Sequence, residues 1–283
     1  GFGEDCAIDG KFLDTYASKN NTNKCNDNRA EHEATFSCKT YEMKDGSKKQ
    51  EWHYGFRAHI ICDAKYGLPI KSKVTPANNS EQTELDNLLK EMQNNDKEQY
   101  KLEKMKNLMG DAGYDNGSRN KRIKEEYNVN PIIDIVHRWD KTEKYREIEN
   151  QPIAYTEEGE VFYIVDLNNY EKMKYLGYDR ENKALRYTRY NTGKKIYRIP
   201  LETDYRIFTS VARDSKKFKK KYKMRTEIER LNGRIDRDYM FNDHFIRGQK
   251  KMELMLNLTF IVMLTIAKGH IKNKQENIRS LVA

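Results

Sequence analysis

The sequence predicts an α/β fold in which helices flank one mixed sheet of five strands. The first observation behind this prediction is the order of elements in residues 1–137, where a strand, a hairpin, a helix, a strand, a helix and a strand follow one another. The second is a change of pattern in residues 138–213, where aromatic, alternating segments replace helical periodicity. The third is composition, because 37% of the 283 residues are hydrophobic and 11% are aromatic, whereas a disordered chain is typically poor in aromatic residues.

The first half of the predicted sheet begins with a short apolar run. Residues 6–13 (CAIDGKFL) are bounded by polar sequence, as a strand is, and Asp9 lies in the middle of the run. Residues 52–63 and 68–74 are aromatic and β-branched segments on either side of a Lys-Tyr-Gly turn, which predicts a hairpin. A helix is expected over residues 78–92, with Asn or Ser as its N-cap and apolar side chains at helical spacing, namely Leu85, Leu88, Leu89 and Met92.

The second half of the predicted sheet consists of two short strands joined by a helix. Residues 107–110 (NLMG) form the fourth strand, so that Asp111 lies at its carboxyl end. The glycines and asparagine of the following DAGYDN segment mark a turn into a helix over residues 118–127. Residues 131–136 (PIIDIV) complete the sheet as its fifth strand.

The middle of the chain has a different pattern, which we interpret as a β-rich insertion. Its expected strands are residues 161–165, 183–190, 195–199 and 205–211. Helical sequence resumes at Ser215 and continues to the end. The most apolar stretch, residues 252–267, has only 16 residues and includes Glu253, whereas a membrane span needs about 20 apolar residues. We therefore expect a buried core helix there and no membrane partner.

Charge and cysteine content indicate an intracellular, basic protein. The chain has 53 Lys and Arg against 44 Asp and Glu, a net charge of +9 that suits a polyanion, although it is weak evidence for nucleic acid alone. Its four cysteines show neither Cys-x-x-Cys pairs nor zinc spacing, so we expect reduced thiols. Because the chain opens with Gly1 rather than Met, we expect it to be a piece of a longer protein.

A strongly basic segment leads into the helix that carries the third candidate acidic residue. Residues 216–225 hold seven basic residues in ten. At about 100° per residue on one helix, Tyr222, Arg225, Glu229 and Asp236 lie within roughly 60° of one another, away from the apolar stripe. Arg225 and Glu229 could equally form an ordinary helix ion pair worth about 0.2–0.5 kcal/mol. The rival carboxylate, Glu227, lies far around the helix from Arg225.

These residues resemble the three acidic motifs of the DDE transposases of bacterial insertion sequences. The matching segments are Asp9 in CAIDG, Asp111 in GDAGYDN, and Tyr222, Arg225 and Glu229 at the spacing of a Tyr-x2-Arg-x3-Glu-x6-Lys motif. Residues 56–78 and 247–258 also look like that family's hairpin and closing helix, so the resemblance covers nearly the whole chain.

The resemblance implies a domain organisation. It implies a ribonuclease-H-like catalytic core, which we place in residues 1–137 and 214–283. The β-rich insertion is then residues 138–213. An amino-terminal domain that binds the element ends would precede this chain.

The same resemblance implies metal-dependent DNA chemistry. Asp9, Asp111 and Glu229 would hold two Mg²⁺ or Mn²⁺ ions, since hard cations prefer carboxylate oxygens, and would catalyse cleavage and strand transfer at element ends. Its partners would be double-stranded DNA, as element ends and as target, and a second copy of the chain on that DNA. It would work in the bacterial cytoplasm, at the nucleoid when bound. The residues expected to contact DNA are Lys219, Lys220, Lys221, Tyr222, Arg225 and Arg237. Trp139 and the tyrosines of the insertion are candidates for stacking on unpaired bases.

One position departs from the family pattern. The terminal Lys of the third motif falls at Asp236, so its role in gripping DNA is either lost or taken by Arg234 or Arg237. The departure motivates an alternative function, a catalytically inactive or domesticated transposase-derived protein that only binds DNA. A junction or repair nuclease on the same core is a third reading, although such an enzyme would not need the long insertion.

Overall fold

The structure, a computed structural model, describes residues 1–17, 31–43, 45–167, 169–190 and 195–279. The chain divides into two compact units. The first combines Gly1–Leu102 with Thr226–Ala283, and the second is Glu103–Arg225. The second unit therefore contains the whole predicted insertion together with sequence on both sides of it.

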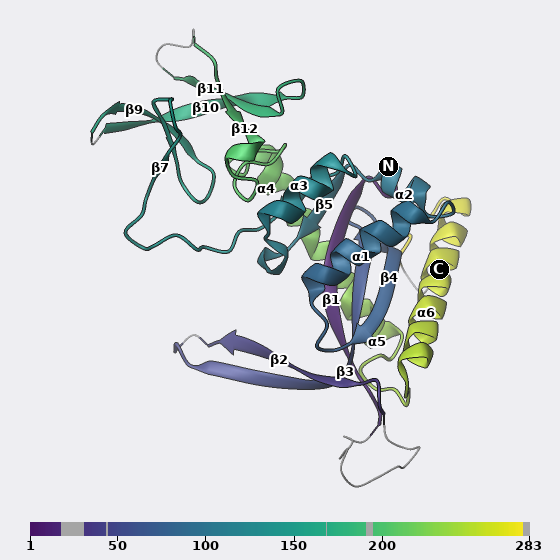
Figure 1. Cartoon of the computed structure of the whole chain (residues 1–283). Coiled ribbons are helices and arrows are strands. Elements are labelled where there is room, and N and C mark those ends of the chain that lie inside the picture. Colours follow the sequence, from purple (N-terminus) through teal and green to yellow (C-terminus); the bar gives the residue numbers. More distant parts are fainter. Residues whose placement is uncertain (18–30, 44, 168, 191–194, 280–283) are drawn as a thin grey trace. The chain divides into compact units, whose positions relative to one another are not determined.

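The first unit contains a fully antiparallel sheet. Its strands are β1 (Asp5–Asp14), β2 (Thr35–Glu42), β3 (Lys48–Asp63) and β4 (Leu68–Pro76). The long strand β3 organises the sheet, because its first half pairs with β2 and its second half lies between β1 and β4 (Figure 1). The predicted first strand and hairpin are confirmed. The strand β2 was not predicted, so the core elements include six strands among the described residues rather than the expected five.

Helices cover both faces of this sheet. Helix α1 (Glu81–Asn94) begins after Ser80, as predicted, and α5 (Thr226–Asp238) follows later in the chain, whereas the short α2 (Gln99–Lys104) spans the boundary between the units. Adjacent residues of a strand point to opposite faces. A Cβ on Gly10 would meet Glu81 of α1 at 2.6 Å, whereas Asp9 bonds Asn232 of α5. The two helices therefore lie on opposite faces, and Asp9 belongs to the α5 face.

Helix α6 (Gln249–Lys272) lies beside β4 (Figure 1). Only one face of the helix is buried. Met252, Leu256 and Met263 are buried, whereas Leu254 is 57% exposed and Ile261 is 59% exposed. The predicted helix is thus confirmed, but the expectation of a buried core helix is wrong for its outer face. Among the described residues α6 is also the one helix long and apolar enough to cross a membrane by length and composition.

A buried histidine in β3 makes the stability of the first unit depend on pH. The His59 side chain is fully buried, and its Nε2 lies 2.9 Å from Thr75 Oγ1. Burial lowers the pKa of this imidazole from 6.5 to about 4, and the neighbouring Arg57 and Lys73 act in the same direction while Glu84 opposes them. Between these two pKa values the unfolded chain therefore binds a proton that the folded protein excludes.

We expect the neutral His59 to leave the free energy of unfolding at its full value above pH 6.5. As the pH falls from 6.5 towards 4, proton binding by the unfolded chain lowers this free energy. The loss is on the order of 3 kcal/mol of unfolding free energy. The measurement is urea unfolding between neutral and acidic pH, with His59→Leu as the comparison. If the two proteins lose stability in parallel across this range, the imidazole is not held neutral.

The second unit begins with a parallel strand pair. Strand β5 (Asn107–Gly110) lies beside β6 (Asn130–Ile133), with Gly110 opposite Ile133, and α3 (Gly117–Glu125) joins them. The predicted strands and helix are confirmed. The strand β6 ends three residues earlier than expected, and directly after it the Asp134 carboxylate accepts the backbone N–H of Ile135 at 3.0 Å.

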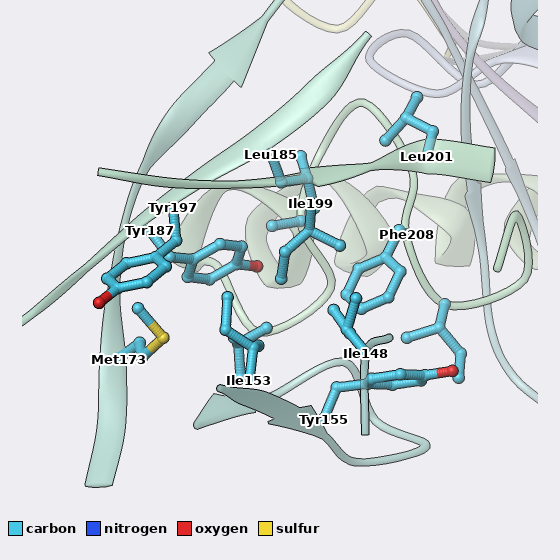
Figure 2. Close-up of a cluster of buried hydrophobic side chains, with 13 residues drawn as sticks. Ile148, Ile153, Tyr155, Met173, Leu185, Tyr187, Tyr197, Ile199, Leu201 and Phe208 are labelled. Atoms are coloured by element: carbon cyan, nitrogen blue, oxygen red, sulfur yellow. The ribbon is translucent and has the colours of Figure 1, made fainter. Parts of the chain in front are cut away.

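The rest of the second unit is mainly one antiparallel sheet in the strand order β12-β11-β10-β9-β8-β7. Its strands are β7 (Arg146–Glu147), β8 (Ile153–Tyr155), β9 (Val161–Asp166), β10 (Asn169–Asp179), β11 (Ala184–Arg189) and β12 (Tyr197–Pro200). A cluster of buried aliphatic and aromatic side chains stabilises it, among them Ile153, Tyr187 and Ile199 (Figure 2). The β-rich character expected of residues 138–213 is therefore present.

The strand expected over residues 205–211 is wrong, because this segment is a turn after the short 3-10 helix η2 (Leu201–Thr203). Ile207 and Phe208 are consecutive, yet both side chains are buried in the cluster. Consecutive side chains of a strand point to opposite faces, so a turn is what allows both to enter one core. Of the strand expected over residues 195–199, the described part begins at residue 195, since 191–194 lie outside the described residues.

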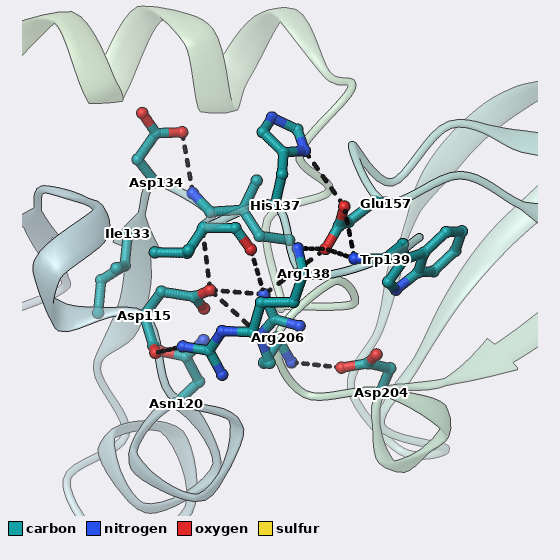
Figure 3. A network of polar contacts seen from close by, with 12 residues as sticks. Asp115, Asn120, Ile133, Asp134, His137, Arg138, Trp139, Glu157, Asp204 and Arg206 are labelled. Atoms are coloured by element: carbon teal, nitrogen blue, oxygen red, sulfur yellow. Dashed lines mark hydrogen bonds and ion pairs between the residues drawn. The ribbon is translucent and has the colours of Figure 1, made fainter. Parts of the chain in front are cut away.

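A buried polar network lies beside this cluster (Figure 3). Arg206 donates to Asp115 Oδ2 from Nε at 3.1 Å and from Nη2 at 2.8 Å, and the same oxygen accepts the Val136 N–H at 3.0 Å. Glu157 accepts the backbone N–H groups of Arg138 at 2.6 Å and of Trp139. The network gives hydrogen-bond partners to buried carboxylate oxygens of this loop-rich region, although Asp115 Oδ1 has none in the described part of the chain. Further unmade hydrogen bonds there would be costly.

The basic segment forms two elements rather than part of one helix. Helix α4 (Lys216–Tyr222) begins at a Ser215 cap and ends at Tyr222, and a 3-10 turn, η3 (Lys223–Arg225), follows before α5 begins. The expectation that Tyr222, Arg225, Glu229 and Asp236 share one face of an uninterrupted helix is therefore wrong. A 3-10 turn rotates by about 120° rather than 100° per residue, so it changes the angular relation of the residues on its two sides.

Candidate active site

The first acidic residue lies on the sheet face that α5 covers. Asp9 occupies the middle of β1, where it is partly exposed and pairs in register with Ile60. One of its carboxylate oxygens accepts the Asn232 Nδ2–H at 2.9 Å, and the other accepts the backbone N–H of Gly10 at 2.9 Å. These bonds hold the carboxylate in a defined orientation.

The α5 surface opposite this strand carries Glu229, Asn232 and Asp236. These positions follow the i, i+3, i+7 spacing of one helix face, whereas Ile228, Leu231 and Ile235 form the buried face. Asn232 contacts Asp9, and Asp236 pairs with Lys11, two residues further along β1, at 2.5 Å. Two adjacent turns of the helix are therefore in register with one face of the strand, and Glu229 lies on the next turn.

A cavity of about 680 Å³ opens at this place in the first unit. Its acidic and basic lining consists of Asp9, Lys11, Asp14, Lys39, Glu51, His53, Asp236, Asp243 and His244, and Asn232 lines it as well. Five carboxylates in one cavity are notable in a protein with a net charge of +9. Such a cavity favours cations.

The rival carboxylate Glu227 has a different environment from Glu229. It is buried and forms ion pairs with Arg230 and with Arg279, the latter at 2.5 Å. Glu229 is exposed on the helix. Buried, paired carboxylates mainly stabilise structure, so Glu229 is the better placed of the two for chemistry in solvent.

The charged residues around position 236 have distinct roles. Arg234 is partly buried and donates to the backbone carbonyl of Gly67, so it anchors α5. Arg237 is exposed and pairs with Asp238 at 2.7 Å. Lys11 brings an ammonium group directly to Asp236. Sequence reasoning did not single out Lys11, because only the fold places it opposite a residue 225 positions away.

The second acidic residue lies in the second unit, at the carboxyl end of β5. Asp111 is partly exposed, and its Oδ1 accepts the Gly113 N–H at 2.9 Å, which caps the 3-10 helix η1 (Ala112–Tyr114). A Cβ at position 113 would lie 2.9 Å from the same oxygen. Glycine at this position therefore keeps the carboxylate in place.

An additional carboxylate lies at the same edge of the parallel pair. Asp134 follows β6 as Asp111 follows β5, and its backbone N–H donates to the Gly110 carbonyl at 3.3 Å. The Tyr222 hydroxyl donates to Asp134 Oδ2 at 3.1 Å, and the Arg225 guanidinium lies 5.8 Å from the Tyr222 ring. Burial, and then the Asp134 charge, raise the pKa of the Tyr222 hydroxyl.

Of the predicted residues, the second unit thus gathers Asp111, Tyr222 and Arg225 at one edge of β5 and β6, and the first unit holds Asp9 and Glu229. Asp134 was missed because it was assigned to a strand interior. Its signal in the sequence is an acidic residue directly after a buried apolar run, as at Asp111. Lys219 and Lys220 are exposed on α4 and Lys221 is partly exposed.

The donor chemistry around Asp9 suits a hard cation. No group of three or more His, Cys, Asp or Glu side chains in the described ranges is arranged to hold a metal ion on its own. However, Asn232 Oδ1 is buried beside Asp9 without a hydrogen-bond partner in the described part of the chain. A carboxylate with an adjacent unsatisfied amide oxygen provides the oxygen ligands that Mg²⁺ prefers.

Comparison with known families gives one match over most of the chain. A family model described as the transposase DDE domain matches residues 1–265. Comparison with curated proteins and with solved structures finds no match.

Proposed function

Because this chain belongs to the transposase DDE domain family, we propose that it is the catalytic domain of an insertion-sequence transposase. It would cleave DNA at the ends of the element and join the freed 3′ ends to target DNA. The observation that carries the proposal is the contact of Asp9 with the α5 face that also bears Glu229. This contact joins two of the three acidic motifs, which are 220 residues apart in sequence.

We propose that Asp9, Asp111 and Glu229 together hold two Mg²⁺ or Mn²⁺ ions. Such ions supply activation of the attacking oxygen and stabilisation of the leaving oxygen in phosphoryl transfer. The chain's own contribution is orientation. Asn232 fixes the Asp9 carboxylate by donating to it, and Gly113 does the same for Asp111 through its backbone N–H.

We propose that the exposed basic residues near these motifs bind DNA phosphates. Lys219, Lys220 and Lys221 on α4 present consecutive ammonium groups, and Arg225 lies beside Tyr222. Arg237 would contribute less, because Asp238 offsets part of its charge. The partners would be double-stranded element ends and target DNA, bound by a homodimer in the bacterial cytoplasm.

Asn232 is expected to act as a positioning residue. Replacing it with Leu removes the donor to Asp9 at similar volume, and losing an outer-shell partner of a metal ligand typically costs about 10- to 100-fold in activity or metal affinity. Single-turnover strand joining and Mn²⁺ affinity are the measurements. Asn232→Asp keeps an oxygen at this position but has no N–H to donate. If Asn232→Leu and Asn232→Asp both bind Mn²⁺ as tightly as the parent chain, this amide does not orient Asp9.

The second candidate function is that of an inactive copy that only binds DNA. The observation in its favour is Asp236, which stands where the Tyr-x2-Arg-x3-Glu-x6-Lys motif that the sequence resembles has Lys. The ion pair between Lys11 and Asp236 argues against it, since the cavity retains an ammonium group at this place. We propose that Lys11 supplies the positive charge that the third motif lacks.

A charge exchange tests this proposal. Asp236→Lys alone places a second ammonium group beside that of Lys11, and like charges repel at the distance of the present pair. Because this repulsion would displace Lys11, we expect strand joining to fall several-fold. The double exchange Lys11→Asp with Asp236→Lys restores the pair and should recover most of the joining. If Asp236→Lys alone raises joining, Lys11 does not play this role.

Calorimetric titration of Mn²⁺ tests the proposed function without knowledge of the element ends. Asp111→Asn is expected to weaken or abolish metal binding, whereas Asp140→Asn, the same change at an exposed turn of the same unit, should not. Binding by the parent chain should strengthen when a DNA duplex is present. If the Asp111→Asn and Asp140→Asn proteins give identical titrations, the second candidate function, an inactive copy that only binds DNA, is favoured.

A further inference from the structure

The second unit has a groove of about 1220 Å³ at the ends of β5 and β6 opposite to Asp111 and Asp134. The first residues of the two strands, Asn107 and Asn130, line it. The rest of the lining comes from residues 103–106 before β5, from the end of α3 and the turn after it, and from β10 and the turn after it. Residues between 201 and 215 and Lys217 of α4 complete it. We name it the Lys124 groove, and its charged lining is Lys106, Lys124, Arg180, Lys183, Lys217, Glu103 and Glu125.

The groove has an excess of positive charge. Five basic side chains line it against two glutamates, and Glu125 is already paired with Lys183 at 3.2 Å. Lys124 and Arg180 have no carboxylate within ion-pair distance in the described part of the chain. Two cations that lie together without a counter-charge are unfavourable unless an anion joins them.

Lys124 is held in place by neutral groups. Its Nζ donates to Asn130 Oδ1 at 3.0 Å and to Asn128 Oδ1 at 3.3 Å, and Asn130 donates in turn to Asn107 Oδ1 at 3.1 Å. An ammonium group has three donors, so these amides leave one for a ligand, and the Nζ also lies 5.9 Å from the centre of the Tyr178 ring. Burial, and then the charge of Arg180, lower the pKa of Lys124, which is the effect that a bound anion would reverse.

Tyrosine rings line the same groove, and a defect in β10 directs two of them to it. Tyr175 and Tyr178 are three residues apart, so in a regular strand they would point to opposite faces. The register against β11 shifts between Tyr175 and Gly177, and Gly177 has a φ of +137° that favours glycine. The bulge adds one residue to this part of the strand, so that Tyr175 and Tyr178 both line the groove, together with Tyr127 and Tyr205.

We propose that the Lys124 groove is a second DNA-binding site, which holds the phosphodiester backbone of a single strand. Lys124 and Arg180 bind its phosphates, and the tyrosines receive its unpaired bases, because every base offers a face for stacking. The identity of the ligand as DNA rests on the proposed function. The site itself lies at the other end of β5 and β6 from Asp111, so it is distinct from the carboxylates that carry the reaction.

The test is the salt dependence of binding to a labelled single strand about ten nucleotides long, a length that one such groove can cover. Fluorescence anisotropy is measured in EDTA over a series of salt concentrations. Arg180→Gln and Lys124→Gln are each expected to reduce the slope of log K against log salt by about 0.7, the value for one phosphate contact on single-stranded nucleic acid. Arg180 is exposed and makes no hydrogen bond in the described residues, so its variant should fold normally.

Lys174→Gln is the matched control, since Lys174 is an exposed lysine of the same strand β10 outside the groove. It should leave the slope unchanged. Tyr178→Leu should instead lower the affinity about tenfold at constant slope, because stacking does not depend on salt as phosphate contacts do. If Lys124→Gln and Arg180→Gln both bind the single strand with the affinity and the salt slope of the parent chain, the proposal is overturned.

Inorganic phosphate serves as a second probe. If phosphate protects the parent against thermal unfolding and the variants do not change oligonucleotide binding, the groove binds a small anion and the proposal fails. Because the assay contains EDTA, it does not depend on the metal-binding carboxylates. If the parent chain does not join DNA strands but its salt slope still exceeds that of the Lys124→Gln and Arg180→Gln variants, the proposed function is refuted and the groove proposal stands.

Discussion

Asp9→Asn is expected to abolish metal-dependent nicking and strand joining, with a loss on the order of a thousandfold or more, the scale seen when a charged catalytic group is removed. The amide keeps the size of the side chain and can still bond Asn232, so the fold should persist. It removes the negative charge that a divalent cation needs. Glu229→Gln should have the same effect for the same reason.

Asp14→Asn is the control for this experiment. Asp14 ends the same strand β1, lines the same cavity and is mostly exposed beside His53. Its loss should leave joining within a few-fold of the parent. Joining by Asp9→Asn at the level of Asp14→Asn would show that the carboxylate on β1 is not part of the reaction site. Parental unfolding curves for all three variants would exclude loss of fold as the cause.

The sequence predicted those elements whose hydrophobic pattern is strong. Helices α1 and α5 each bury one apolar face, and that burial produces a readable period. The first strand and the hairpin are apolar segments bounded by polar sequence. Helix α3 buries a single apolar side chain, Ile123, and was predicted from the turn residues before it. Strand β2 was missed because it is almost entirely exposed and pairs only with β3, so no alternation marks it. The break between α4 and α5 was missed because no Pro or Gly accompanies it.

The candidate site could be predicted only in part, for a different reason. Asp9, Asp111 and Glu229 were proposed because their order and spacing resemble a family motif, and their joint role stays a prediction. Asn232 and Lys11 belong to no motif, and their roles arise from the register of α5 against β1, which depends on how the helix packs. The Lys124 groove was equally unreadable, since α3, β10 and the ends of β5 and β6 meet there from distant parts of the second unit.

Arg206→Met is the substitution with the largest expected effect on stability. It leaves the Asp115 carboxylate, whose side chain is fully buried, without the guanidinium that pairs with it at 2.8 Å. Removing one partner of a buried ion pair typically costs about 3–5 kcal/mol, because the remaining charge is uncompensated. The nearby Glu157, 3.8 Å from the same guanidinium, would add repulsion.

Arg198→Met is the matched control, since Arg198 also pairs with an aspartate of the second unit, Asp179 at 3.0 Å, but its side chain is 50% exposed. An exposed pair contributes about 1 kcal/mol or less, so the two Arg→Met changes should differ several-fold in cost. The chain has two tryptophans, and in a Trp52→Phe background Trp139, which donates to Glu157, reports unfolding of the second unit alone. If Arg206→Met and Arg198→Met lower the free energy of unfolding equally, Asp115 is hydrated rather than buried as an unpaired charge. If Asp115 is not hydrated, adding Asp115→Leu to Arg206→Met should recover stability, because it removes the unpaired charge.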